Sequence, residues 1–291
     1  MFSGSYVAIV TPFKNNKIDY EKLKDLVKFH IENKTDGIVP CGTTGEAATL
    51  SHEEHKQVIE TVVKSANKKI KVIAGTGSNN TAEALRLTQF AKKVGADGAL
   101  LISPYYNKPT QKGMYLHFKT IADSVDIPIM LYNIQSRTAV NIEPETIAKL
   151  VKDCKNIVAV KEASGSLDQM SKIKFLCPEI ELLSGDDSLT LPLLSIGGVG
   201  VVSVVANIVP RDVSEMVFSY LKGNLKKAQE LHYKLFPLIK AMFIETNPIP
   251  VKTAMGLLGM CSPELRLPMS EMEPQNIEKL KKALKDYGLL K

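Results

Sequence analysis

The sequence contains only four cysteines, and they are far apart: Cys41, Cys154, Cys177 and Cys261. Their spacing matches neither a metal-binding motif nor a disulfide scaffold, so we expect reduced thiols in a cytoplasmic protein. Cys41 stands beside the strongest motif of the chain, but a packing role is favoured for it over a chemical one.

Long apolar runs are also missing. None reaches the roughly 18 to 20 residues that a membrane-spanning helix needs, so no contact with a membrane is predicted. Residues 1–4 do not start a charged segment followed by an apolar one. We therefore expect no signal peptide.

The chain has little excess of one charge. Its 37 basic and 31 acidic residues give a formal net charge of +6, and the lysines are scattered, so no nucleic-acid partner is predicted. Hydrophobic residues make up 44% of the chain and charged residues 23%. This composition is typical of a globular protein and excludes disordered, collagen-like and disulfide-rich classes.

Short apolar runs alternate with longer amphipathic ones along most of the chain. Strands are predicted at 6–11, 37–41, 71–74, 98–103, 127–132, 157–161, 181–184 and 199–204. Helices are predicted after each strand, around residues 23–31, from 51, 80, 111, 144 and 167, at 189–195, and from 211. Residues 51–54 read Ser-His-Glu-Glu, which is a capping box that starts the second helix.

Eight strand–helix units with continuously apolar strands predict a parallel sheet covered on both faces. The count favours an α/β fold of the (β/α)8 TIM-barrel type, with an open doubly wound sheet as the alternative. We expect residues 1–222 to form the barrel with the active site. Residues 223–291 are expected to form a C-terminal helical extension packed on the barrel, and its last helix has an apolar stripe of Ile277, Leu280, Leu284 and Tyr287.

In such a barrel the chemistry lies where strands end. Gly-Thr-Thr-Gly-Glu at 42–46 offers hydroxyls and backbone N–H groups that suit a carboxylate, although a polar tight turn explains the motif equally well. Residues 75–80 begin like a dinucleotide-binding motif but have Asn80 in place of the third glycine, which favours a structural turn.

Aromatic hydroxyls and an arginine follow the next two strands. Tyr105 and Tyr106 come after one strand, and Tyr132 ends the other, with Arg137 in the loop beyond it. A phenol at a strand end can relay protons, and an arginine can bind a carboxylate with two hydrogen bonds. Each tyrosine alone is also compatible with an interface or core role.

Lys161 carries the strongest chemical signal, because a lysine at the end of a buried strand is rare. Burial lowers the pKa of its ammonium group and leaves a neutral amine that can attack a carbonyl and form a Schiff base. The alternative is an ion pair with Glu162. Successive strand residues point to opposite faces, so that pair is geometrically poor.

No metal site is predicted. His52 and His55 lie three residues apart at a helix start, but no third ligand is evident, so exposed or ligand-contacting histidines are favoured.

Ordered sequence blocks along almost the whole chain resemble the dihydrodipicolinate synthase family, within the pyruvate-dependent class I aldolases. These blocks are GSYVAIVTP at 4–12, GTTGEAATL at 42–50, AGTGSNNTAEA at 74–84, PYYNKPTQKG at 104–113, YNIQSRT at 132–138, VKEASG at 160–165, LSGDD at 183–187, NPIPVK at 247–252 and RLPM at 266–269. The resemblance implies condensation of pyruvate with L-aspartate 4-semialdehyde, in the diaminopimelate route to lysine.

The resemblance also implies roles for individual residues. Lys161 would form the imine with pyruvate and act as the electron sink, so that no metal or organic cofactor is needed. The other implied catalytic residues are Thr43, Tyr132 and Tyr106 as a proton relay, and the implied substrate-binding residues are Thr44 for the pyruvate carboxylate, Arg137 for the semialdehyde carboxylate, and Gly185 and Val202 through their backbone. Tyr106 would reach a neighbouring subunit's active site, which implies a homo-oligomer, a tetramer built from tight dimers.

The family also has a lysine feedback site at a subunit interface. The residues that match it are His52, His55, Asn79, Glu83 and Tyr105, which implies L-lysine as an inhibitor. Ala47 stands where some relatives have serine.

Two departures affect the loop of Arg137. Gln135 replaces a proline of the family motif and Ala139 a glycine. Losing the proline frees the backbone of this loop, and we expect a change in affinity rather than in the reaction.

Two other functions remain open from the sequence. A sister aldolase, such as N-acetylneuraminate lyase or a keto-deoxy sugar-acid aldolase, shares the lysine and the tyrosine but generally lacks the Ser-Arg-Thr segment at 136–138. The other alternative is a catalytically inactive barrel that acts as a sensor or binding protein.

Overall fold

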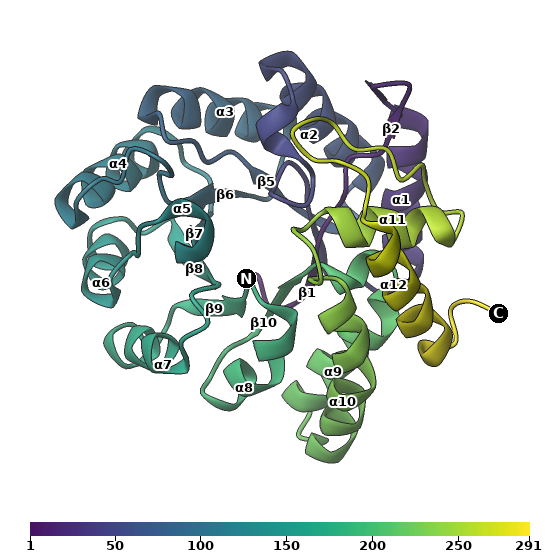
Figure 1. Ribbon diagram of the computed structural model, residues 1–291. Coiled ribbons are helices and arrows are strands. Elements are labelled where there is room, and N and C mark those ends of the chain that lie inside the picture. The colour runs from purple at the N-terminus through teal and green to yellow at the C-terminus, as the bar shows by residue number, and fades with distance from the viewer.

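Eight parallel strands close into a barrel in the computed structural model, which describes all 291 residues (Figure 1). The strands are β1 (Gly4–Ala8), β4 (Gly37–Val39), β5 (Lys71–Gly75), β6 (Gly98–Ile102), β7 (Ile129–Asn133), β8 (Ile157–Glu162), β9 (Glu181–Ser184) and β10 (Gly200–Ser203). They are paired in chain order, and β10 pairs with β1. The predicted TIM barrel is thus confirmed and the open sheet excluded.

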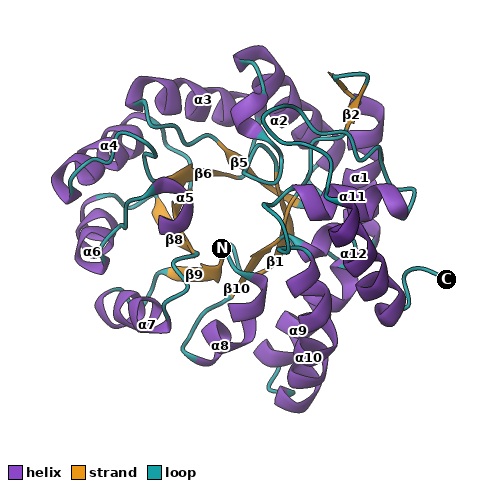
Figure 2. Cartoon of the chain, viewed as in Figure 1, coloured by secondary structure: helices purple, strands orange, loops and turns teal.

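Helices surround the barrel, and those of the C-terminal segment lie together on one side of it, near β1 and α1 (Figures 1 and 2). The helices between the strands are α1 (Tyr20–Glu32), α2 (His52–Ala66), α3 (Thr81–Val94), α4 (Gln111–Ser124), α6 (Pro144–Asp153), α7 (Leu167–Leu176) and α8 (Thr190–Ser195). After β10 follow α9 (Pro210–Leu221), α10 (Leu225–Ala241), α11 (Ile249–Leu257) and α12 (Pro274–Tyr287). None of the helices combines the length and the apolar character that crossing a bilayer requires.

Side-chain caps fix where several helices begin, and α2 and α3 are two of them. Ser51 accepts from the backbone N–H of Glu54, whose side chain accepts from the N–H of Ser51, so the predicted capping box of α2 is confirmed. Asn80 accepts from Ala82 and Glu83 at the start of α3. Asn80, which stands in place of the third glycine of the motif at 75–80, is therefore a helix cap.

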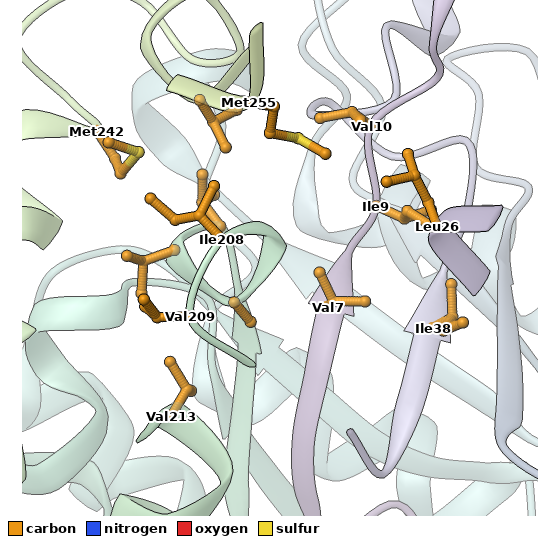
Figure 3. Close-up of a cluster of buried hydrophobic side chains, with 14 of the residues drawn as sticks. Val7, Ile9, Val10, Leu26, Ile38, Ile208, Val209, Val213, Met242 and Met255 are labelled. Carbon is orange, nitrogen blue, oxygen red and sulfur yellow. The ribbon is translucent and has the colours of Figure 1, made fainter. Parts of the chain in front are cut away.

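Several predicted bounds were wrong at the ends of strands. The first strand ends at Ala8 instead of continuing to residue 11. The prediction was too long because Ile9 and Val10 are apolar without belonging to the strand. They belong to a cluster between the barrel and the C-terminal helices, where Met242 and Met255 lie near Ile208 (Figure 3).

Several short elements were not predicted. They are the antiparallel hairpin of β2 (Phe13–Lys14) and β3 (Lys17–Ile18), the single-turn helix α5 (Gln135–Thr138), and the 3-10 helices η1 (Ala47–Thr49), η2 (Asp187–Leu189) and η3 (Val205–Asn207). All are too short for a hydrophobic period to be recognised.

The barrel interior is filled by a separate cluster of eleven buried residues. Ala159 of β8 belongs to it, whereas Val160 packs outside against the helices. Since side chains alternate along a strand, Lys161 points to the same side as Ala159, into the barrel.

Candidate active site

Lys161 is a buried lysine inside the barrel. Its residue is only 6% exposed, and its Nζ lies 3.9 Å from the centre of the Tyr132 ring. Burial lowers the pKa of Lys161 to about 7, and Asp187 only partly counteracts this. A large fraction of the amine is therefore neutral near pH 7, as the sequence predicted.

Glu162 is not the partner of Lys161. It accepts hydrogen bonds from Asn133, Gln169 and the backbone N–H of Ser164 on the other face of β8. The alternative of a Lys161–Glu162 ion pair is thus excluded by the alternation of the strand.

Gly185 leaves room for the lysine side chain. A Cβ at this position would lie 2.7 Å from Cβ of Ala163, 3.0 Å from Cε of Lys161 and 3.2 Å from its Cγ. Val202 lies in the interior cluster, opposite Tyr6 of β1. Val202 thus lies in the barrel interior, and Gly185, which follows β9 directly, packs against Lys161.

Tyr132 and Thr43 are paired at the mouth of the barrel. Burial raises the pKa of Tyr132 to about 12, while the positive charge of Arg137 and a hydrogen bond with the Thr43 side chain act in the opposite direction. The phenol therefore stays protonated at neutral pH.

Thr44 and Arg137 are joined by a residue that the sequence did not single out. The side-chain NH2 group of Asn247 donates to Oγ1 of Thr44 over 3.0 Å, and the backbone carbonyl of Asn247 accepts from Nη2 of Arg137 over 3.1 Å. Asn247 belongs to the block 247–252 that carried the resemblance, but it is about 200 residues away from Thr44. Only the folded chain shows this contact.

Arg137 itself lies in α5, between the two departures from the family motif. Thr138 closes this turn by donating to the carbonyl of Ile134 over 2.9 Å. Ala139 follows with a φ of +59°, in the left-handed region that favours glycine. The missing proline is replaced by an ordinary helical residue, and the predicted effect on affinity stays a prediction.

A cavity of about 540 Å³ opens beside these residues. Its lining includes Thr43, Tyr132 and Arg137, and also four of the five predicted feedback residues: His52, His55, Glu83 and Tyr105. The two predicted sets of residues therefore share one hollow. Cys41 also lines it, but its thiol is buried, which raises its pKa and fits a packing role.

Four of the five feedback residues are linked to one another in pairs, and the fifth contacts the backbone of Gly75. Nδ1 of His52 lies 3.2 Å from Oε1 of Glu83, and the side-chain amide of Asn79 donates to the carbonyl of Tyr105 over 3.1 Å. Nε2 of His55 lies 2.7 Å from the carbonyl of Gly75. No three histidine, cysteine or carboxylate side chains come together in a way that could hold a metal ion.

Tyr106 is the one predicted catalytic residue that stands apart. It is 89% exposed and its φ is +74°, an uncommon conformation for a bulky residue. Within one chain it does not line the cavity that contains Tyr132 and Thr43.

The closed barrel and the buried lysine near its mouth suit one class of protein, the Schiff-base aldolases among the lyases. A family model described as the dihydrodipicolinate synthetase family matches residues 1–287. The chain belongs to this family, and its activity is the synthesis of 4-hydroxy-tetrahydrodipicolinate in lysine biosynthesis.

Relatives are similar over the full length. A 4-hydroxy-tetrahydrodipicolinate synthase from Endomicrobium trichonymphae is 64% identical over 291 residues, which are 100% of both chains. The crystal structure of dihydrodipicolinate synthase from Aquifex aeolicus is 56% identical and covers 99% of each chain with a TM-score of 0.98. The enzyme from Cyanidioschyzon merolae, crystallised with lysine bound, is 42% identical over 99% of each chain, with a TM-score of 0.97. These similarities favour the predicted activity over that of a sister aldolase or an inactive barrel.

Proposed function

We propose that Lys161 carries the reaction by forming an imine with pyruvate. The neutral Nζ adds to the ketone carbon, a C–N bond forms, and the ketone oxygen leaves as water. Loss of a proton from the methyl carbon then gives an enamine, which attacks the aldehyde carbon of L-aspartate 4-semialdehyde. The observation that supports this most directly is the burial of Lys161, with its pKa lowered to about 7.

Tyr132 is proposed to move the protons of these steps. Its phenol is protonated at neutral pH and lies against Lys161, and Thr43 is its hydrogen-bond partner. A donor in contact with the amine can protonate the leaving hydroxyl and recover the proton later. Tyr106, brought by a second subunit, would complete the relay.

The substrates are proposed to be held by their carboxylates. Thr44 would bind that of pyruvate, next to the backbone of Gly185 and Val202. Arg137 would bind that of the semialdehyde from the cavity wall, since a guanidinium matches a carboxylate with two parallel hydrogen bonds.

A turnover assay with pyruvate and L-aspartate 4-semialdehyde tests this function. Activity should be present in the natural chain and absent in Lys161→Ala, and pyruvate with borohydride should add a stable mass at Lys161. Turnover of sialic acid with no turnover of the semialdehyde would support a sister aldolase instead. Labelling that persists in Lys161→Ala would remove Lys161 from the mechanism.

The exposure of Tyr106 supports a homo-oligomer, with tight dimers assembled into a tetramer. Subunits of Lys161→Ala mixed with subunits of Tyr106→Phe test this arrangement, because each heterodimer then has one complete site. Random mixing should restore roughly a quarter of the natural activity. Each variant alone should have low activity. A mixture no more active than the mean of the two variants would refute the insertion of Tyr106 into a neighbouring subunit's site.

L-Lysine is proposed as a feedback inhibitor at His52, His55, Asn79, Glu83 and Tyr105. Glu83 supplies a carboxylate for the ligand's ammonium group, and the relative from Cyanidioschyzon merolae was crystallised with lysine bound. Activity should fall as L-lysine is added, and Glu83→Gln should weaken this response. Activity that stays flat into the millimolar range would contradict the proposal.

A further inference from the structure

A fully buried ion pair joins the threonine motif of the active site to the C-terminal helices. Nζ of Lys252, in α11, lies 2.6 Å from Oε1 of Glu46, and the two side chains are 0% and 1% exposed. Their other polar contacts are also made inside the protein. Lys252 donates to the carbonyl of Glu264 over 2.6 Å, and the backbone N–H of Arg266 donates to Oε2 of Glu46 over 3.1 Å.

One aromatic ring supports both cations of this cluster. Phe13 of the hairpin is buried, and its ring centre lies 4.1 Å from Nζ of Lys252 and 4.5 Å from Cζ of Arg266. Contacts of this kind favour the charged form of a desolvated lysine. The carboxylate of Glu46 does the same, against the burial that lowers the pKa of Lys252.

Glu46 is part of the turn that presents Thr43 and Thr44. Its backbone N–H donates to the carbonyl of Thr43 over 3.0 Å, and its φ is +53°. A non-glycine residue in this conformation persists where its surroundings hold it. The contacts of the Glu46 side chain therefore set the path of the backbone that carries both threonines.

The same C-terminal segment touches this turn at two further points. Asn247 donates to Thr44, as described above. The guanidinium of Arg266 donates to the carbonyl of Thr49 over 3.1 Å and forms two hydrogen bonds with Glu54 in the first turn of α2. The loop between β4 and α2 is thus fastened to residues that follow the barrel in sequence.

A buried ion pair contributes little to stability compared with apolar side chains of the same volume, because both charges lose their water. Its hydrogen bonds are directional, however, and fix the two segments in one relative position. The pair is thus better suited to placing the turn than to strengthening the core.

We propose that Lys252 is a positioning residue for pyruvate, which acts through Glu46 to hold Thr43 and Thr44 where they meet the substrate. This inference rests on the proposed role of Thr44 at the pyruvate carboxylate. It makes the C-terminal helices part of the active-site machinery, although Lys252 does not contact the substrate.

Lys252→Met tests the inference through the two KM values. The KM for pyruvate should rise roughly 10- to 100-fold, as expected when a hydrogen bond to a charged carboxylate is lost, while the KM for L-aspartate 4-semialdehyde stays unchanged. Lys161 should still be trapped by borohydride when pyruvate is saturating, because its amine is untouched.

Asp212→Asn is the matched control. Asp212 accepts hydrogen bonds from Lys234 and Tyr287 and so ties α9 to α10 and α12, but it has no contact with the turn at 43–46. Its loss should lower the melting temperature and leave the KM for pyruvate unchanged. An equal rise of this KM in Lys252→Met and Asp212→Asn would show a general loss of stability and overturn the proposal.

The double variant Glu46→Gln/Lys252→Met separates placement from stability. Removing both charges leaves no unpaired buried charge, so the melting temperature should recover from that of Lys252→Met, while the raised KM for pyruvate remains. This variant serves the same purpose if Lys252→Met does not fold. An unchanged KM for pyruvate in the double variant would refute the positioning role. Failure of the unsubstituted protein to turn over pyruvate would instead refute the proposed function itself.

Discussion

The protonation of Lys161 gives the imine step a predictable pH profile. Only the neutral amine attacks pyruvate, and burial lowers the pKa of this lysine to about 7. The rate of imine formation should therefore fall about tenfold for each pH unit below 7 and level off above about pH 8. An exposed lysine, with a pKa near 10.4, would instead keep gaining rate up to about pH 10.

The same burial lowers the stability of the natural chain. In the unfolded state Lys161 keeps its proton up to about pH 10.4, whereas the folded protein releases it near pH 7. Between these values the unfolded state binds more protons, so the contribution of Lys161 to the free energy of unfolding rises with pH. The difference corresponds to at most about 5 kcal/mol, at about 1.4 kcal/mol for each pKa unit.

Lys161→Met should therefore be more stable than the natural chain, and most so at and below pH 7. The gain should shrink as the pH rises toward 10. Urea unfolding of both proteins at several pH values measures it, because contributions of other groups cancel in the difference. Rapid mixing with pyruvate, followed by borohydride and mass analysis, measures the imine step. A gain independent of pH, together with an imine rate that still rises above pH 8, would refute the reasoning.

Three further changes have defined outcomes. Gly185→Ala should slow borohydride labelling of Lys161 roughly 10- to 100-fold, because the new Cβ would lie 2.7 Å from Cβ of Ala163 and 3.0 Å from Cε of Lys161, so that the amine is displaced. Labelling at an unchanged rate would contradict this. Arg137→Lys should raise the KM for L-aspartate 4-semialdehyde by roughly tenfold or more and leave the KM for pyruvate unchanged, since lysine cannot form the bidentate contact. A change in the KM for pyruvate alone would contradict this prediction. Ala139→Gly should stabilise the chain by about 1 kcal/mol in urea unfolding, because it relieves a positive φ, whereas the helical control Ala148→Gly should destabilise it by a similar amount.

The repeating part of the fold could be predicted from the sequence, because each unit has its own local signals. The strand at 181–184 was placed without error, and helices were correctly started at Gln111, Pro144 and Leu167. The position of Lys161 also followed from local information, since alternation along one strand decides which side chains enter the barrel. The division of the chain at residue 222 stays a prediction.

The long-range contacts that hold the site in place could not be predicted in the same way. Asn247, Lys252 and Arg266 meet the loop between β4 and α2 across more than 200 residues of sequence, and no periodicity reports such contacts. One signal was present in α11, where Lys252 interrupts the run Ile-Pro-Val-Lys-Thr-Ala-Met. A lysine in an apolar helix requires a buried partner, but the sequence does not name Glu46.

Some of the unfavourable backbone conformations lie where the chemistry is proposed, whereas others lie in the β2–β3 hairpin and after α1 and α2. Cys41 and Glu46 follow β4, Tyr106 follows β6 and Ala139 follows β7, all at the end of the barrel where strands finish, and each has a positive φ. Such residues cost on the order of 1–3 kcal/mol each and persist only where surrounding contacts hold them. For Glu46 the restraint is its buried pair with Lys252. The side chain of Tyr106 is exposed, but both of its neighbours are held within the chain, because Asn79 donates to the carbonyl of Tyr105 and Asn107 donates to the carbonyl of Asn79. The turn on either side of Tyr106 therefore supplies the restraint on its backbone.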